Sequence, residues 1–258
     1  MVLVWARLIL VLGLVIMVHE LGHAWALYRL GIPLERLGIG APVPFLTLRF
    51  RNIERFRIEQ LTISPILFWG WVKPTEKGSL ALAEMDYSAR ASVYGGGIWA
   101  NMLATAILFA LSLVTTELPG FNGVGARAAF ALLIFALLKF RRQFSTYVVP
   151  ALAVVTLILL ASSLVSSPKD AFHGPIGIAR DSAAEPVTPS SFYWQLLNLQ
   201  FAIGITQALP IGGLDGGKYL SMWAENWKSA GLRKAVNTGG MALLVLLILG
   251  SCVGDLIR

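Results

Sequence analysis

Long apolar stretches alternate with polar and basic segments along the whole chain. The stretches cover residues 2–27, 93–116, 126–140, 147–165, 191–209 and 240–257. A bilayer core about 30 Å thick needs roughly 20 apolar residues per helical span. The stretch 126–140 is short, so it must tilt or lie in a thinner bilayer. The pattern predicts an all-α polytopic membrane protein with about six transmembrane helices in one membrane-embedded domain, residues 1–258.

A different pattern occupies the segment between the first two stretches, about residues 28–91. Apolar residues alternate in part with charged or polar ones over residues 47–63. The apolar positions are Leu48, Phe50, Phe56, Ile58, Leu61 and Ile63. This alternation predicts a small β-hairpin near the membrane. The exposed edge of such a hairpin could hold an extended substrate by strand addition. A basic hairpin that contacts anionic lipid explains the pattern equally well.

Composition and charge support this membrane arrangement. Of 258 residues, 56% are hydrophobic and 14% are charged, whereas soluble domains carry about a quarter charged residues. The net charge of +7 does not require nucleic acid, because basic residues of membrane proteins collect in cytoplasmic loops. The first long loop holds Arg29, Arg36, Arg49, Arg51, Arg55, Arg57, Lys73, Lys77 and Arg90. This loop and the basic segments near Arg141 and Lys218 share the cytoplasmic side only if all six stretches cross, with both termini outside.

A metal-binding motif lies within the first stretch. His19-Glu20-Leu21-Gly22-His23 has the form H-E-x-x-H, and the chain contains only three histidines. Histidines four residues apart share one helix face, where they can bind one zinc ion while the intervening glutamate reaches its water. Ionisable residues inside a span are costly and usually functional. The alternative is a polar patch that packs helices together.

The third zinc ligand must come from elsewhere in the chain, since hydrolytic zinc sites usually have three protein ligands. The remaining histidine, His173, lies in a loop predicted to be outside. Asp215 follows the fifth stretch and precedes two glycines, and the six-span topology places it at the depth of His19. We therefore expect Asp215 as the third ligand. Taken alone, Asp-Gly is equally typical of a turn.

These motifs together resemble the site-2 protease family of intramembrane zinc metalloproteases. The matching segments are His19–His23, Phe68–Lys73, Gly97–Asn101, Gly174–Ala179 and Leu209–Gly217. The chain departs from the family pattern at Gln207, where the family has an asparagine that supports the substrate carbonyl or oxyanion. It also has Ile98, Gly212 and Gly213 at proline positions. Residues 118–173 hold mainly apolar stretches, so the resemblance is to a compact member without a PDZ domain.

The resemblance implies an intramembrane zinc metalloprotease that cleaves in or near a transmembrane segment of a membrane-protein substrate. Glu20 would be the catalytic base, and Gln207 and Asn101 would support the substrate or oxyanion, although Asn101 could instead pack helices. We expect a prokaryotic inner-membrane protein with its site near the cytoplasmic face. Its expected partners are the substrate and the bilayer, without nucleic acid or any cofactor besides zinc. A zinc transporter and an inactive membrane scaffold remain the alternatives.

Overall fold

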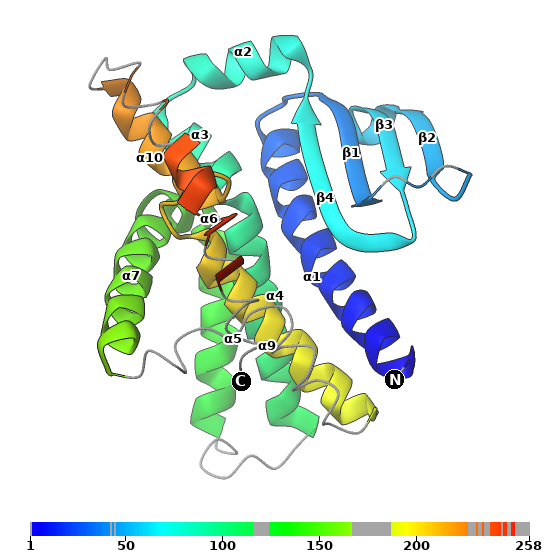
Figure 1. The fold of residues 1–258 in the computed structure, drawn as a ribbon, viewed down its shortest axis with the longest axis vertical. Helices are drawn as coiled ribbons and strands as arrows, with labels where there is room; N and C mark the ends of the chain where they lie inside the picture. Colours follow the sequence, from blue (N-terminus) through cyan, green and yellow to red (C-terminus); the bar gives the residue numbers. More distant parts are fainter. Residues whose placement is uncertain are drawn as a thin grey trace.

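The computed structural model describes residues 2–41, 43, 45–115, 124–166, 187–226 and scattered positions between 231 and 250. Most of the described chain is helical, with a sheet after the first helix (Figure 1). The longer helices are α1 (Val2–Arg29), α4 (Gly96–Thr115), α5 (Val124–Lys139), α7 (Val149–Ser166) and α9 (Pro189–Gln207). The shorter ones are α2 (Glu76–Glu84), α3 (Tyr87–Tyr94), α6 (Arg141–Gln143), a π-helical segment (Phe144–Val148) and α10 (Asp215–Asn226).

The segment after α1 forms a four-stranded sheet with the order β2-β3-β1-β4. Its strands are β1 (Leu34–Ala41), β2 (Leu48–Ile53), β3 (Ile58–Ile63) and β4 (Ile66–Pro74). Strands β2 and β3 pair antiparallel, which confirms the predicted hairpin. Strand β1 pairs parallel to β3 and antiparallel to β4. The β-structure is therefore larger than a hairpin, and β4 lies at one edge of the sheet.

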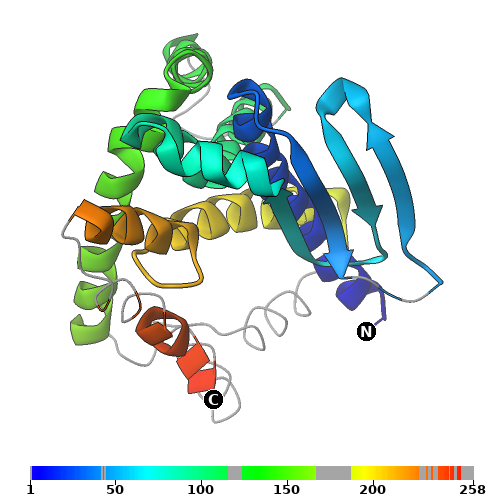
Figure 2. The same cartoon turned by 90° about the horizontal axis from the view of Figure 1, so that it is seen from above.

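Helix α1 lies between the sheet and the other long helices (Figures 1 and 2) and contacts β4, α4 and α9. It approaches α4 most closely at two glycines. A Cβ atom on Gly22 would lie 2.2 Å from the Gly96 carbonyl oxygen and 2.6 Å from the Ala100 Cβ. Small residues let two helix backbones touch in this way. The contact brings one face of α1 against the first turns of α4.

Two helices in the described part of the chain are long and apolar enough to cross a membrane. They are Trp5–Arg29 within α1 and Gly96–Leu113 within α4. Helices α5, α7 and α9 coincide with three further predicted stretches, but their crossing of a membrane stays a prediction. The stretch 240–257 lies largely outside the described residues. His173 and the family-like segment Gly174–Ala179 lie outside them altogether.

A tight turn after α9 sets the position of α10. It contains Gly213, whose φ of +96° suits a residue without a side chain. Three apolar residues of the same segment, Leu209, Ile211 and Leu214, form a small buried cluster. One turn into α10, the Tyr219 hydroxyl lies 2.9 Å from the Ala91 carbonyl oxygen and 2.8 Å from that of Ser145. These contacts fix the start of α10 beside α3.

Candidate metal centre

The two motif histidines share one face of α1, as their spacing predicts. The His19 and His23 Nε2 atoms lie 3.2 Å apart, and both side chains are buried. Residues four apart on an α-helix lie one above the other, so local helix geometry alone produces this pair.

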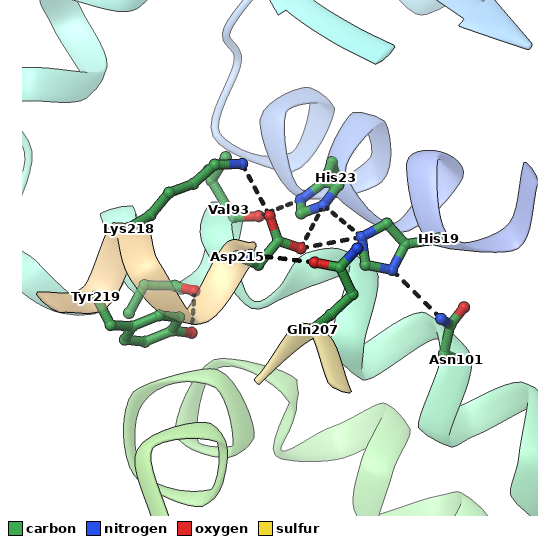
Figure 3. A network of polar contacts seen from close by, with 9 residues as sticks. His19, His23, Val93, Asn101, Gln207, Asp215, Lys218 and Tyr219 are labelled. Carbon is green, nitrogen blue, oxygen red and sulfur yellow. Dashed lines mark hydrogen bonds and ion pairs between the residues drawn. The ribbon is translucent and has the colours of Figure 1, made fainter. Parts of the chain in front are cut away.

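Asp215, the first residue of α10, completes a group of three (Figure 3). Its Oδ2 atom lies 3.0 Å from His19 Nε2 and 2.9 Å from His23 Nε2. Only 4% of the Asp215 residue is exposed. Among the described residues, these three form the one group of three or more His, Cys, Asp or Glu side chains whose ligand atoms lie close enough to hold a metal ion. The structure thus brings Asp215 to the two histidines from a position almost two hundred residues away.

The contacts of His23 show which of its nitrogens faces the group. Its Nδ1 lies 2.7 Å from the Val93 carbonyl oxygen. A carbonyl oxygen can only accept, so Nδ1 carries the proton and Nε2 presents a lone pair. Metal-binding histidines commonly donate their second ring nitrogen in this way.

Asn101 occupies the corresponding place beside His19. Its Nδ2 lies 3.3 Å from His19 Nδ1, while its Oδ1 is buried without a hydrogen-bond partner. The amide oxygen and nitrogen have nearly the same shape, so turning the amide over lets Oδ1 accept from His19 Nδ1–H. That orientation satisfies the buried oxygen and leaves His19 Nε2 free to bind a metal. Asn101 lies behind His19 and is not among the residues that line the adjoining cavity.

The donor set fits a zinc ion. Two lone-pair nitrogens and a carboxylate oxygen converge, and the Asp215 Oδ2 lacks a hydrogen-bond partner. Ligands about 2.0–2.1 Å from a tetrahedral zinc ion lie about 3.3 Å from one another. The three measured separations are 2.9, 3.0 and 3.2 Å, within a few tenths of an ångström of that value. A cation removes the repulsion between the converging lone pairs.

Two further residues hold Asp215 in place. The Gln207 Oε1 atom accepts a hydrogen bond from the Asp215 backbone nitrogen at 3.2 Å, and Figure 3 shows its amide nitrogen turned toward His19. The Lys218 Nζ atom lies 2.8 Å from Asp215 Oδ1. Burial raises the pKa of the Asp215 carboxyl, but the His23 imidazole and the Lys218 ammonium outweigh it and hold that pKa well below its usual range. Asp215 is therefore ionised at neutral pH, as a ligand must be.

Two residues of this site, Lys218 and Val93, were not predicted from the sequence. Lys218 follows Asp215 by three residues, a spacing that pairs charges on a helix, so its position was a usable signal. Val93 contributes only its backbone carbonyl, which any residue carries. No side-chain pattern could have identified it.

A cavity of about 490 Å³ opens beside the three residues. Its lining includes residues of α1, Gln207 and Lys218, and Gly70, Trp71, Val72 and Pro74 of β4. Glu20 lines it as well and packs against β4, because a Cβ atom on Gly70 would lie 2.5 Å from the Glu20 Cγ. The carboxylate of the motif and the edge strand of the sheet thus face the same space.

Comparison with known proteins agrees with this geometry. The family model described as "Peptidase family M50" matches residues 7–248. The chain belongs to peptidase family M50. This membership confirms the resemblance to site-2 proteases, and M50 is a membrane-embedded family of zinc metalloproteases.

One relative of known name is similar to a part of the chain. The protein named "Putative zinc metalloprotease PM1991" from Pasteurella multocida (strain Pm70) is 32% identical over 124 residues. The match covers 45% of this chain and 27% of the relative, so the chain spans about a quarter of that M50 relative's length.

Proposed function

We propose that this protein is an intramembrane zinc metalloprotease that hydrolyses a peptide bond in or near a transmembrane segment of a membrane-protein substrate. The observation that carries the proposal is the convergence of His19, His23 and Asp215 next to Glu20 in one cavity. Membership of family M50 supports it. The two candidate membrane helices support the membrane location, which we place in a prokaryotic inner membrane with the site near the cytoplasmic face.

The proposed chemistry divides among the residues that line the cavity. The Nε2 atoms of His19 and His23 and the carboxylate of Asp215 would hold zinc. A bound zinc ion would supply Lewis acidity toward the scissile carbonyl and the attacking water. Glu20 takes the proton of that water and passes it to the leaving amine.

Gln207 and Asn101 take different supporting roles in this proposal. The Gln207 amide nitrogen is free to donate, because its oxygen is occupied by the Asp215 backbone N–H. It therefore suits the carbonyl oxygen of the substrate as negative charge develops there. Asn101 acts through His19, whose Nδ1 it contacts, and does not reach the substrate.

The edge strand β4 is the proposed place where the substrate is held. Strand β1 pairs with one side of β4, and no described strand pairs with the other. Four residues of β4 line the cavity that contains Glu20, namely Gly70, Trp71, Val72 and Pro74. A substrate helix must unwind before its peptide bond reaches the site, and an unwound segment can pair with a free strand edge through main-chain hydrogen bonds.

A Glu20→Gln variant tests the proposal. Purified wild type and variant would be incubated with candidate single-span membrane substrates, and the zinc content of both would be measured. We expect the variant to retain zinc and to lose cleavage, because Glu20 moves the proton but does not bind the metal. Glu59→Gln on β3 is the matched control, since Glu59 is exposed, and it should cleave as the wild type does.

The same experiment separates the two alternative functions. Equal cleavage by wild type and Glu20→Gln would refute the proposed mechanism. Absence of cleavage in both, with intact zinc binding, would indicate an inactive scaffold. Zinc flux across proteoliposomes without proteolysis would indicate a transporter. A transport path needs several ionisable ligands along its length, and in the described residues only one metal-binding group is found.

A further inference from the structure

A second, apolar groove of about 350 Å³ runs between α1 and α4, away from the metal centre. On α1 it is lined by Val18, Leu21, Gly22 and Trp25. Residues separated by three or four positions share a helix face, and these lie on a different face from His19 and His23. None of the groove residues lines the cavity of the metal centre. The groove is therefore a separate feature of the two helices that are long and apolar enough to cross a membrane.

Helix α4 supplies the opposite wall. Trp99, Leu103 and Ile107 lie at successive turns, and Ala100 and Ala104 leave the space between them. The shape of the groove suits a linear apolar chain, because large side chains form its walls and small residues form its floor. Polar surface is nearly absent from the lining.

Two arginines stand at one end of this groove. The Arg141 guanidinium lies 5.5 Å from the centre of the Trp99 ring. Arg29 follows Trp25 by four residues, so it lies one turn further along the same face of α1. Neither arginine makes an ion pair with the acidic residues that the structure describes.

The electrostatics of this pair are unfavourable as they stand. The Arg141 Nη1 atom is buried and has no hydrogen-bond partner. Burial lowers the pKa of Arg141, and the positive charge of Arg29 lowers it further. An anion between these two like charges would offset both the burial of Arg141 and the repulsion from Arg29.

We propose that this groove binds an anionic phospholipid, with an acyl chain between α1 and α4 and the headgroup phosphate between Arg29 and Arg141. Guanidinium groups bind phosphate through paired, charge-assisted hydrogen bonds. Basic pockets between helices on the cytoplasmic side are typical sites for anionic headgroups. Trp99 lies beside Arg141 and Trp25 one turn before Arg29, and tryptophan is the residue type enriched where helices meet the lipid headgroups. The charge at the groove's end favours lipid over an uncharged helix of a substrate.

Native mass spectrometry of the full chain tests this inference. The detergent-solubilised protein would be mixed with phosphatidylglycerol or with phosphatidylcholine, and retained lipid and Tm would be measured. We expect the wild type to retain phosphatidylglycerol and to gain thermal stability from it, with a smaller effect of phosphatidylcholine. Arg141→Gln should weaken phosphatidylglycerol binding about tenfold, because it removes charge-assisted hydrogen bonds. Arg49→Gln on the exposed strand β2 is the matched control and should bind like the wild type.

A second variant keeps the inference testable if Arg141→Gln does not fold. Ala104→Phe fills the groove without changing charge, and it should also reduce retained phosphatidylglycerol. Equal retention of both lipids by wild type and Arg141→Gln would overturn the proposal. Protection of the groove from labelling by an apolar substrate helix, and not by phosphatidylglycerol, would overturn it as well. These measurements need no protease activity, so they are independent of the proposed function.

Discussion

At the scale of single residues, the candidate metal centre depends on groups behind the proposed ligands. His23 donates to the Val93 carbonyl, and His19 faces the Asn101 amide. Each contact fixes which ring nitrogen carries the proton and how the ring is turned. Without them the two imidazoles could rotate or protonate at Nε2, and neither would then suit the proposed zinc site.

Replacement of Asn101 should therefore lower zinc affinity without removing a ligand. We expect Asn101→Leu to weaken zinc binding about 10- to 100-fold, the usual effect of losing such a partner. Asn101→Asp should restore most of the affinity, because a carboxylate also accepts from Nδ1–H. Competition with a chelator measures the affinity. Asn198→Leu on the exposed face of α9 should leave it unchanged, and a loss there equal to that of Asn101→Leu would contradict the role.

Substitution of two glycines, Gly70 and Gly97, can test the proposed base and a proposed ligand separately. An added Cβ atom on Gly70 would lie 2.5 Å from the Glu20 Cγ, whereas one on Gly97 would lie 2.4 Å from the His19 Cε1. Gly70→Ala should displace the base and reduce cleavage about 100-fold, with zinc retained. Gly97→Ala should displace a ligand and reduce both zinc content and cleavage. Loss of zinc in Gly70→Ala would show that β4 supports the ligands and not the base.

The sequence predicted the local part of this site better than the distant part. His19, Glu20 and His23 follow from the period of one helix. Asp215 needed a topological assumption about depth, and the structure places it beside them. The contact of Lys218 with Asp215 depends on where α10 begins, and that start is fixed by the tertiary contacts of Tyr219.

At the scale of elements, the hydrophobic pattern predicted only two of the four strands of the sheet. Alternation predicted the β2–β3 hairpin, and the structure confirms it. Strand β1 was not predicted because Gly38 and Gly40 weaken its strand signal. The structure explains Gly38, since a Cβ atom there would lie 2.2 Å from the Trp71 ring. Strand β4 is a nearly continuous apolar run, a pattern that does not separate strand from helix.

The attachment of α10 to α3 gives a stability prediction. Tyr219→Phe removes the hydroxyl that contacts the Ala91 and Ser145 carbonyl oxygens, both in the interior. We expect a loss of about 1 kcal/mol in the free energy of unfolding, the net value of one buried hydrogen bond, since the Ala91 carbonyl also accepts from the Gly95 backbone N–H. Thermal unfolding measures it. Tyr147→Phe is the control, since Tyr147 is 71% exposed, and an equal loss there would contradict the role of the hydroxyl.

The start of α3 gives a pH prediction. Asp86 accepts a hydrogen bond from the Ala89 backbone nitrogen at 2.6 Å and pairs with Arg142 of α6 at 2.8 Å. These two contacts lower the pKa of Asp86. A carboxylate with a lowered pKa stabilises the fold above the usual aspartate range and loses that contribution as pH falls through its folded-state pKa.

Asp86→Asn isolates this charge, because asparagine also caps helices well. The variant should unfold at a lower temperature than the wild type at pH 7. The difference should shrink as the pH falls below about 4, the usual pKa of aspartate. A difference that stays constant from pH 7 to pH 3 would show that the charge of Asp86 does not stabilise the α3–α6 contact.

At the scale of the whole molecule, the helix order bears on the number of membrane crossings. The ion pair of Asp86 with Arg142 joins the segment before α4 to the segment after α5. Both ends of the α4–α5 pair therefore lie at the same end of the molecule (Figure 1). If α4 crosses the bilayer, α5 must cross back. Its 16 residues span about 24 Å, so the bilayer beside it must be thin.

Labelling from one side of sealed vesicles tests this arrangement. In a Cys252→Ser background, cysteines introduced at Lys77 and at Lys139 should react from the same side. Cysteine at Glu59, on the sheet, should react with them. Labelling of Lys77→Cys and Lys139→Cys from opposite sides would show that α5 does not cross. The result bears on the predicted six spans. Five of them coincide with described helices, whereas the passage of these helices through lipid stays a prediction.

The contact of Gly22 with Gly96 has a consequence for protein design. Leu21 lines the apolar groove between α1 and α4, and Gly22 touches the α4 backbone. The residues at both unspecified positions of the histidine motif therefore face α4. Grafting the five residues onto another apolar helix would reproduce only the two histidines and the glutamate, without Asp215. A working transplant would also need a partner helix with glycine at the crossing, an amide one turn later and a free carbonyl beside the second histidine. The smallest portable unit thus includes parts of α1, α3, α4 and α10.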